Sequence, residues 1–426
     1  MRHLAIAILA MAASAFADSY IVLFKQAEVA ITSLDHGGFQ SLLQTSNQKS
    51  VTQLQEWLGG RGLSKGVDNL WMVRGAIVSI DDAAAKKLAK EPWVHGVYVD
   101  RVRKFVNPTT DITIGNSLKE LGEDPASLWG LTKIGLQKIR AEFPYLDGSG
   151  VRVGVLDTGI QSKHPELPGT AVFKDFVNNL PRAYDDHGHG THVSGTISGK
   201  QVGIAPKVSL TMGKIFGAAG SGSDSTILRA MQWIFDPDSN PATNDFPQLV
   251  SNSWGGDLDP TATTYDIAEF APYHIAIQAW IYGGIVPIFA AGNSGANPNG
   301  FPGGLPEALA VGAIDTDDTV AEFSSRGPNL WKIGDVVLSI LKPDISAPGV
   351  KVTSAFPGNK FATWAGTSMA TPHVSGTVAL MLQANPKLTY AAIKDILMKS
   401  SDRKVDINYG YGILNAYQAV KLASGK

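Results

Sequence analysis

Cysteine is absent from all 426 residues of the chain. The protein therefore has no disulfide, no thiol nucleophile and no zinc held by cysteine sulfur. Its stability has to come from the size of its core, with a bound metal ion as a further source. This is feasible, because a domain of roughly 300 residues buries most of the surface that its unfolded chain exposes.

Charge is scarce, and the two signs balance. Only 17% of the residues are charged, and 36 Lys+Arg against 38 Asp+Glu leave a formal charge of −2. This balance argues against a nucleic-acid partner and against a polybasic membrane-surface protein. The 44% hydrophobic content and the 45 glycines indicate a well-packed globular chain with many tight turns.

Long apolar runs are also missing, apart from residues 4–13 near the N-terminus. This run follows Met1-Arg2-His3, is too short to span a bilayer comfortably, and precedes the small-residue pattern Ala15-Phe16-Ala17. The arrangement predicts a secretory signal peptide over residues 1–17, with a buried N-terminal helix as the alternative. We expect a secreted protein, extracellular or periplasmic according to its source, that does not stay in the membrane after the signal is removed.

Residues 18–106 predict a small α+β unit, and we find no internal repeat or low-complexity tail. Strands are expected at residues 20–24, 73–80 and 94–99, and helices at 38–58 and 82–90. We interpret the order as βαββαβ, a ferredoxin-like pattern. Residues 107–127 are polar, contain proline and glycine, and predict a linker.

Residues 128–426 alternate between strand and helix patterns. The expected strands are 151–156, 209–215, 249–253, 285–290 and 308–313, and the expected helices are 190–198, 223–235, 265–282 and 368–383. Such alternation is typical of an α/β fold. It predicts a doubly wound, mostly parallel sheet with helices on both faces.

One serine stands in an unusual place, between a glycine turn and the start of an apolar helix. The segment is Gly366-Thr367-Ser368-Met369-Ala370. Its hydroxyl lies in the field of a helix N-terminus, which suits a nucleophile whose product is an oxyanion. An ordinary Ser/Thr cap is the alternative interpretation.

Two upstream segments favour the nucleophile. The run that ends at Asp157 is an apolar strand followed by Thr-Gly, and the carboxyl end of a central strand is where open α/β sheets place their chemistry. Farther along, His187, His189 and His192 lie at a glycine-rich turn where a helix begins. Acid, imidazole and hydroxyl are the three parts of an activated serine.

These three segments resemble the catalytic blocks of the subtilisin-like serine proteases, or subtilases. The matching letters are VLDTGI around Asp157, HGTHVSGT from His189 and GTSMATPHVSG around Ser368, in that family's order. The resemblance runs from about Leu128 to Ala423. It implies a serine endopeptidase that acts on protein or peptide substrates through an acyl-enzyme and needs no cofactor for its chemistry.

The resemblance also implies a role for each residue. Asp157 orients the imidazole, His189 is the base and Ser368 is the nucleophile. His192 and His373 then lie inside helices as structural histidines, and His187 is a loop histidine near the site.

Two further blocks resemble the substrate cleft and the oxyanion hole of subtilases. Asn293 matches the asparagine of that hole, although a turn residue beside glycine is the simpler interpretation. The implied substrate-binding residues are Ser253, Trp254, Gly255, Ala290, Ala291, Gly292 and Gly300. The family usually has a smaller apolar residue at Trp254. Because no acidic residue lies in these segments, we expect broad specificity that favours large apolar side chains before the cleaved bond.

Residues 18–106 resemble the inhibitory propeptide of subtilases in their position and in their opening letters YIVLFK. The implied organisation is an autoprocessed zymogen. Residues 1–17 are its signal peptide, residues 18–106 its propeptide, and residues 107–127 contain or adjoin the processing site. Residues 128–426 form the catalytic domain, which we expect to be a monomer and to have its own propeptide as chaperone and inhibitor.

A structural calcium ion has one candidate location. The stretch after the histidine helix, residues 198–204, is too short and has too few oxygen ligands for the calcium loop of many subtilases. Asp236, Asp238, Asn240 and Asp245 offer alternating oxygens, which hard cations prefer. An exposed surface loop is the commoner meaning of such a pattern.

Two other functions are alternatives to the serine endopeptidase. A metallohydrolase could use the three histidines with Asp185 and Asp186, but the chain has no HExxH spacing. A noncatalytic binding protein of the same fold would usually have lost a residue of the triad, and here all three matching positions are intact.

Overall fold

The computed structural model describes residues 18–25, 35–63, 66–106, 111–169, 172–402 and 405–425. The predicted signal peptide lies outside the described residues, as does part of the predicted linker. Within the described ranges, no helix is both long and apolar enough to cross a membrane.

A seven-stranded sheet, parallel at every pairing, forms the centre of the larger unit. Its strands, in spatial order, are β17 (Ile345–Pro348), β14 (Leu309–Ile314), β13 (Val286–Ala290), β11 (Leu249–Asn252), β7 (Arg152–Asp157), β9 (Ser209–Lys214) and β8 (Val172–Asp175). The central strands are buried on both faces, which explains their nearly continuous apolar sequences. The predicted doubly wound α/β fold is confirmed. Sequence analysis missed β8 and β17, which are short and carry charged residues or a proline.

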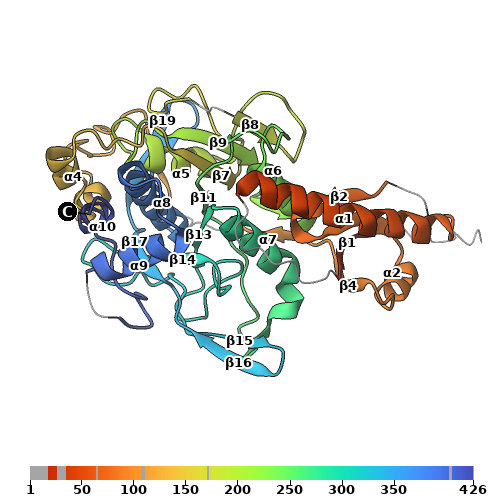
Figure 1. Cartoon of the computed structure of the whole chain (residues 1–426). Coiled ribbons are helices and arrows are strands. Elements are labelled where there is room, and N and C mark those ends of the chain that lie inside the picture. Colours follow the sequence, from red (N-terminus) through yellow and green to blue (C-terminus); the bar gives the residue numbers. More distant parts are fainter. Residues whose placement is uncertain are drawn as a thin grey trace, which may run out of the picture.

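Helices cover the two faces of this sheet, and Figure 1 shows α5, α8 and α10 on one side and α6 and α7 on the other. Alternate residues of a strand point to different cores: Leu249 joins the core under α5 and α8, and Val250 joins the core under α6 and α7. The helices are α3 (Trp129–Lys133), α4 (Leu136–Glu142), α5 (His189–Ser198), α6 (Asp224–Phe235), α7 (Ala271–Tyr282), α8 (Thr367–Ala384), α9 (Tyr390–Ser400) and α10 (Ala416–Ala423).

The helix predicted over residues 265–282 begins six residues late. Tyr265–Asp266 is instead the short strand β12, and Ile267–Phe270 is a 3₁₀ turn. The Asp266 side chain caps this turn by accepting a hydrogen bond from the Ala268 backbone N (2.9 Å). Helix α7 then starts with Pro272 in its first turn, where the missing N–H costs nothing.

Two small sheets flank the central one. The first has the order β12-β15-β16, with β15 (Asn329–Ile333) and β16 (Val336–Ile340). The second has the order β18-β19-β6, with β18 (Val352–Phe356), β19 (Lys360–Trp364) and β6 (Thr113–Gly115). Strand β6 belongs to the predicted linker, so part of that segment pairs with the larger unit.

Residues 18–99 form a separate four-stranded antiparallel sheet with two helices, which we call the N-terminal unit. Its elements are β1 (Asp18–Phe24), α1 (His36–Gly59), β2 (Asp68–Leu70), β3 (Gly75–Ile80), α2 (Asp82–Leu88) and β4 (Val94–Val99). The strand order β2-β3-β1-β4 agrees with the expected βαββαβ pattern. The sequence analysis gave ranges for three of the four strands and did not locate β2. The strand expected from residue 73 starts at Gly75, because Trp71–Val73 is a 3₁₀ turn that ends at Arg74 with φ 56°.

The N-terminal unit packs against α6 and α7, and Figure 1 shows it in red and orange beside them. Ile21 and Leu23 share one hydrophobic core with Ile227 and Met231. His36 lies between the rings of Phe235 and Phe246, with both of its ring nitrogens 2.7 Å from backbone carbonyl oxygens of the larger unit. The interface is therefore partly a continuation of the main core.

Candidate active site

Asp157 is the last residue of β7 and is completely buried. From β7 the chain continues to β8 and β9 on one side of the sheet and later returns to β11 on the other. Strand order therefore reverses at β7, and such a switch point is where open α/β sheets bind ligands at the carboxyl ends of their strands.

His189 is the first residue of α5 and contacts this carboxylate. Its Nδ1 lies 2.8 Å from Asp157 Oδ1, and both side chains are fully buried. Since a carboxylate can only accept, Nδ1 donates, which leaves Nε2 of the neutral ring as an acceptor. The start of α5 is held by Asp185, whose oxygens accept from the backbone N of Gly188 and of Thr191, each at 2.8 Å.

Ser368 is the second residue of α8 and lies at the end of β11. Its Oγ donates a 2.7 Å hydrogen bond to the carbonyl oxygen of Ser253. His189 Nε2 is buried and has no hydrogen-bond partner among the described residues. The three predicted residues thus meet around the ends of β7 and β11, but the serine hydroxyl is bonded to a carbonyl and not to the imidazole.

Asn293 and the backbone of Ser368 border one space above Gly366. Asn293 Oδ1 accepts from the backbone N and the Oγ1 of Thr367, both at 2.9 Å. A Cβ added at Gly366, whose φ is 152°, would lie 3.6 Å from Asn293 Nδ2 and 3.6 Å from Ser368 N. The side-chain nitrogen of Asn293 and the backbone nitrogen of Ser368 therefore lie on the same side of Gly366, whose positive φ favours glycine.

The predicted cleft segments are joined by backbone hydrogen bonds. Gly256 and Phe301 exchange two bonds of 2.8 Å, and Gly300 N donates to Ala291 O at 2.7 Å. These bonds link the chain that follows β11, which carries Ser253, Trp254 and Gly255, to the chain that follows β13, which carries Ala290, Ala291 and Gly292.

Trp254 is buried beneath this cleft. Its Nε1 donates to Leu156 O at 2.8 Å, and its ring centroid lies 5.5 Å from that of Phe289 and 5.6 Å from that of Phe216. On the cleft side the indole contacts Phe105, with 5.4 Å between the ring centroids. Trp254, where subtilases usually have a smaller apolar residue, therefore gives Phe105 an aromatic surface to pack against.

Residues 100–106, which we call the tail, run between β10 and the segment that follows β11. Strand β5 (Val102–Lys104) pairs antiparallel with β10 (Ser221–Ser223). Phe105 O accepts from Gly255 N at 3.1 Å, and Val106 N donates to Gly220 O at 3.2 Å. The tail is thus held by backbone bonds from both sides, the way an added β-strand is held.

Comparisons with known proteins agree with this geometry. The sequence model of the Subtilase family matches residues 148–412, more than half of the chain. The chain belongs to the subtilase family. It is 37% identical to Subtilisin Savinase of Lederbergia lenta over 299 residues, 69% of this chain and 98% of that protein. The predicted family is therefore confirmed.

Two longer relatives are also similar to this subtilase. Serine protease AprX of Bacillus subtilis is 37% identical over 65% of this chain and 67% of its own length. Bacillopeptidase F of Bacillus subtilis is 30% identical over 413 residues, which are 88% of this chain but 28% of that protein. Membership of the family implies a serine endopeptidase that acts on proteins and needs no cofactor for catalysis.

Of the other histidines near the predicted site of this subtilase, His192 and His373 are bonded to the backbone and His187 lies beside His189. Burial lowers the pKa of His192 to about 3 and that of His373 to about 4. His192 Nε2 faces Ala362 O at 3.0 Å, and His373 Nδ1 faces Met369 O at 2.9 Å. Burial also lowers the pKa of His187, whose ring centroid is 6.1 Å from that of His189. Asp186 pairs with Lys214, so the acids of the rival metal interpretation are engaged elsewhere.

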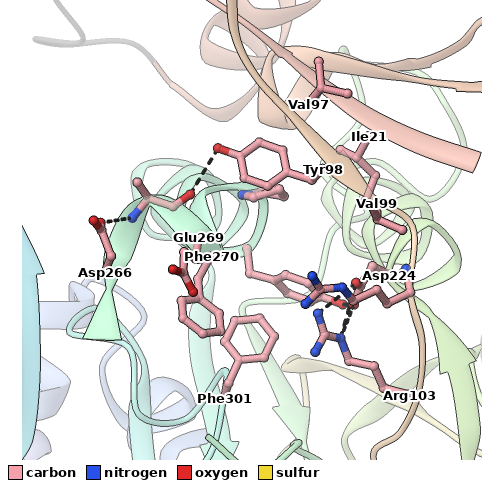
Figure 2. Close-up of a pocket in the computed structure, with 14 residues that line it drawn as sticks. Ile21, Val97, Tyr98, Val99, Arg103, Asp224, Asp266, Glu269, Phe270 and Phe301 are labelled. Carbon is pink, nitrogen blue, oxygen red and sulfur yellow. Dashed lines mark hydrogen bonds and ion pairs between the residues drawn. The ribbon is translucent and has the colours of Figure 1, made fainter. Parts of the chain in front are cut away.

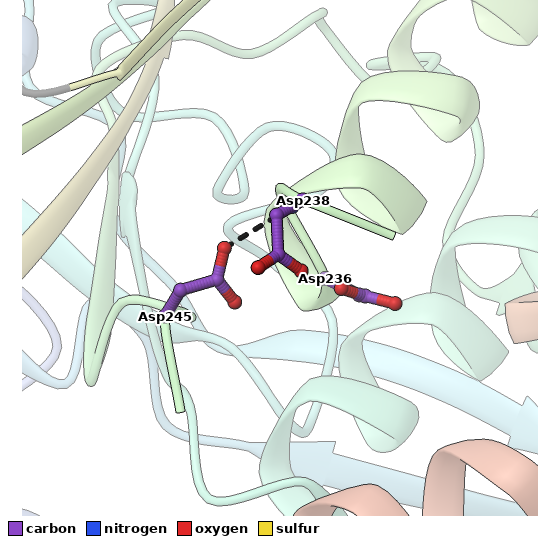
Figure 3. Close-up of side chains that lie close together, drawn as sticks. All are labelled: Asp236, Asp238 and Asp245. Carbon is purple, nitrogen blue, oxygen red and sulfur yellow. Dashed lines mark hydrogen bonds between the residues drawn. The ribbon is translucent and has the colours of Figure 1, made fainter. Parts of the chain in front are cut away.

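The candidate calcium loop does gather carboxylates. In the described part of the chain, the only cluster of three or more acidic or histidine side chains that could hold a metal ion is Asp236, Asp238 and Asp245, with ligand atoms within 4.8 Å of one another (Figure 3). Burial, and then the charges of the other two, raise the pKa of Asp245. None of the three has a described lysine or arginine as an ion-pair partner, so the chemistry fits a hard cation.

Proposed function

We propose that Asp157, His189 and Ser368 form the catalytic triad of a serine endopeptidase that works through an acyl-enzyme. The observation that carries this proposal is the fully buried 2.8 Å contact between His189 Nδ1 and Asp157 Oδ1. A buried carboxylate in this position fixes the imidazole tautomer and stabilises the imidazolium that forms during reaction.

The reaction begins when Ser368 Oγ leaves the Ser253 carbonyl and turns to His189 Nε2. The imidazole takes the hydroxyl proton while Oγ attacks the scissile carbonyl carbon, and the carbonyl oxygen becomes an oxyanion. Asn293 Nδ2 and Ser368 N donate to that oxygen, and the 3.6 Å that separates each nitrogen from the Cβ position of Gly366 supports this role. The imidazolium then protonates the leaving amine, and water releases the acyl group by the reverse sequence of proton transfers.

We infer that residues 18–106 are an inhibitory propeptide. The tail supports this proposal because it occupies the cleft with the backbone pairing that an extended substrate would need. The processing site then lies beyond the tail, within or near residues 107–127. Residues 18–106 then act on the catalytic domain of the same chain, as its inhibitor and as a template for its folding.

We also propose that the protein is exported and acts as a monomer. Export rests on the leader pattern of residues 1–17, and the compartment, extracellular or periplasmic, depends on the source. The secreted Ser368→Ala chain, which should not process itself, should begin at Asp18, which N-terminal sequencing checks. Light scattering of the mature enzyme should give the mass of one chain.

Replacing the nucleophile should stop catalysis. We expect Ser368→Ala to lose casein hydrolysis while keeping its circular dichroism spectrum, because only Oγ is removed. Asn293→Ala should lower kcat by about 10² to 10³, the loss known for subtilisin when this donor is removed. Ser375→Ala, on the same helix, should retain activity. Hydrolysis by Ser368→Ala at a near wild-type rate would show that the mechanism is wrong.

Maturation should be intramolecular. Fragment masses of the wild-type chain should reveal a cut between about Phe105 and Leu128, whereas the Ser368→Ala chain should stay intact. The freed propeptide should inhibit the enzyme, and Phe105→Ala should weaken that inhibition about ten- to hundred-fold, since burying a phenylalanine contributes about 1.5–3 kcal/mol. A wild-type chain that is active while it persists uncut contradicts this proposal.

Specificity should favour large apolar side chains immediately before the cleaved bond. Ser253, Ala291 and Gly292 are small or apolar, and Gly300 adds no side chain to the far end of the proposed pocket. We expect Phe or Leu to raise kcat/KM about ten- to hundred-fold over Ala, if the burial energy is realised in the transition state. Peptides that differ only at this position measure the effect. Preference for Arg, Lys or Asp there would reject it.

The loop that carries Asp236, Asp238 and Asp245 is our proposed structural calcium site. Calcium should raise the melting temperature of the Ser368→Ala chain, and a chelator should reverse the rise, because an ion that binds only the folded state stabilises it. Asp238→Asn should abolish the response, and Asp259→Asn, an exposed aspartate elsewhere, should keep it. A melting temperature that does not change in millimolar calcium would refute the proposed site.

A further inference from the structure

A cavity of about 530 Å³ lies between the N-terminal unit and the larger unit. Figure 2 shows it bordered by Tyr98 and Val99 on one side and by Phe270 and Phe301 on the other, with Arg103 and Asp224 at its edge. Arg103 comes from the tail, whereas Asp224 is the first residue of α6. The only described cation that pairs with Asp224 is therefore carried by the tail.

Arg103 and Asp224 form an ion pair with several hydrogen bonds. Arg103 Nε lies 3.1 Å from Asp224 Oδ1, and Nη2 lies 3.3 Å from Oδ2, so the guanidinium grips both oxygens. Tyr273, itself buried, donates a further hydrogen bond to Oδ1 at 2.9 Å, and the Arg101 backbone N donates to Oδ2 at 3.4 Å. Asp224 is only 4% exposed, while the Arg103 side chain is 33% exposed.

Departure of the tail would take away the described cation that pairs with Asp224. With the tail in place, burial raises the pKa of Asp224, and the charge of Arg103 opposes that rise. A substrate strand that covers Asp224 again would bury its charge, and an unpaired buried charge is costly, so a strand with a cation at this position is favoured. A substrate strand paired with β10, as β5 is, would bring its own side chain to this carboxylate opposite Gly222.

We propose that Asp224 and Tyr273 form a subsite that selects arginine in the substrate at the position that Arg103 occupies, two residues before the residue that replaces Phe105. This inference rests on the proposed endopeptidase function and deepens it. Arginine is preferred over lysine because a planar guanidinium can contact both carboxylate oxygens at once. Substrates are thus chosen by a charged contact upstream as well as by the pocket at the cleaved bond.

The test compares synthetic peptides with the sequence of residues 99–128, cut by active enzyme that was obtained from the full chain. Mass spectrometry identifies the cleaved bond, and kcat/KM is measured for that bond. The peptide with R103Q should be cut about ten- to hundred-fold less efficiently, as expected for loss of hydrogen bonds to a charged group. The peptide with R103K should fall between the two.

The peptide with R101Q is the matched control. Arg101 carries the same charge two positions away, is exposed, and has no described side-chain hydrogen bond or ion pair. Its replacement should leave kcat/KM close to that of the parent peptide. An equal loss from R101Q would mean that general charge attraction, and not a subsite, selects the substrate.

Enzyme variants locate the effect. Asp224→Asn should cut the parent peptide and the R103Q peptide with nearly equal efficiency, and Tyr273→Phe should narrow the difference between them. If the wild-type enzyme cuts both peptides equally well, the subsite is refuted and the ion pair serves only to hold the tail. If it hydrolyses casein but cuts none of the peptides, the subsite is refuted and the endopeptidase function stands; if it hydrolyses neither, the endopeptidase function fails, and the subsite fails with it.

Discussion

The close approach of β7 to the start of α5 is the constraint on which the site depends, because it brings Asp157 within 2.8 Å of His189. Two glycines permit this approach. A Cβ added at Gly190 would lie 2.1 Å from Gly159 O, and one added at Gly159 would lie 2.0 Å from Tyr184 O. A side chain at Gly190 would push the start of α5 away from the end of β7 and separate the acid from the imidazole, and one at Gly159 would push the turn after β7 away from the Tyr184 backbone.

The parts of the fold with strong periodicity were predictable from sequence. Strands ending near Asp157 and Ala290 and the helix that carries Ser368 are long or apolar enough to be recognised alone. The start of α7 was not, because an apolar run continues through a 3₁₀ turn and only Pro272 marks the change. Strand β6 escaped notice because its polar residues form a strand only by pairing with β19.

Positions in the site were predictable, but several contacts were not. Asp157, His189, Ser368 and Asn293 were found through motif and order. The hydrogen bond from Ser368 to the Ser253 carbonyl reflects a side-chain rotation that no pattern encodes. Asp224 reads locally as an acid in the first turn of a helix, where acids are common, and its partner Arg103 is 121 residues away.

The hydrophobic core shared by the N-terminal unit, α6 and α7 would set how the two parts separate if the chain is cut as proposed. A cut beyond Val106 would break the covalent link between the two parts. It would leave in place the apolar contacts of Ile21 and Leu23, the contacts of His36 with the larger unit and the backbone pairing of β5. Before the cut, the effective concentration of the unit is independent of how much protein is present. After it, occupancy of the cleft follows mass action, so dilution itself becomes a way to release the enzyme.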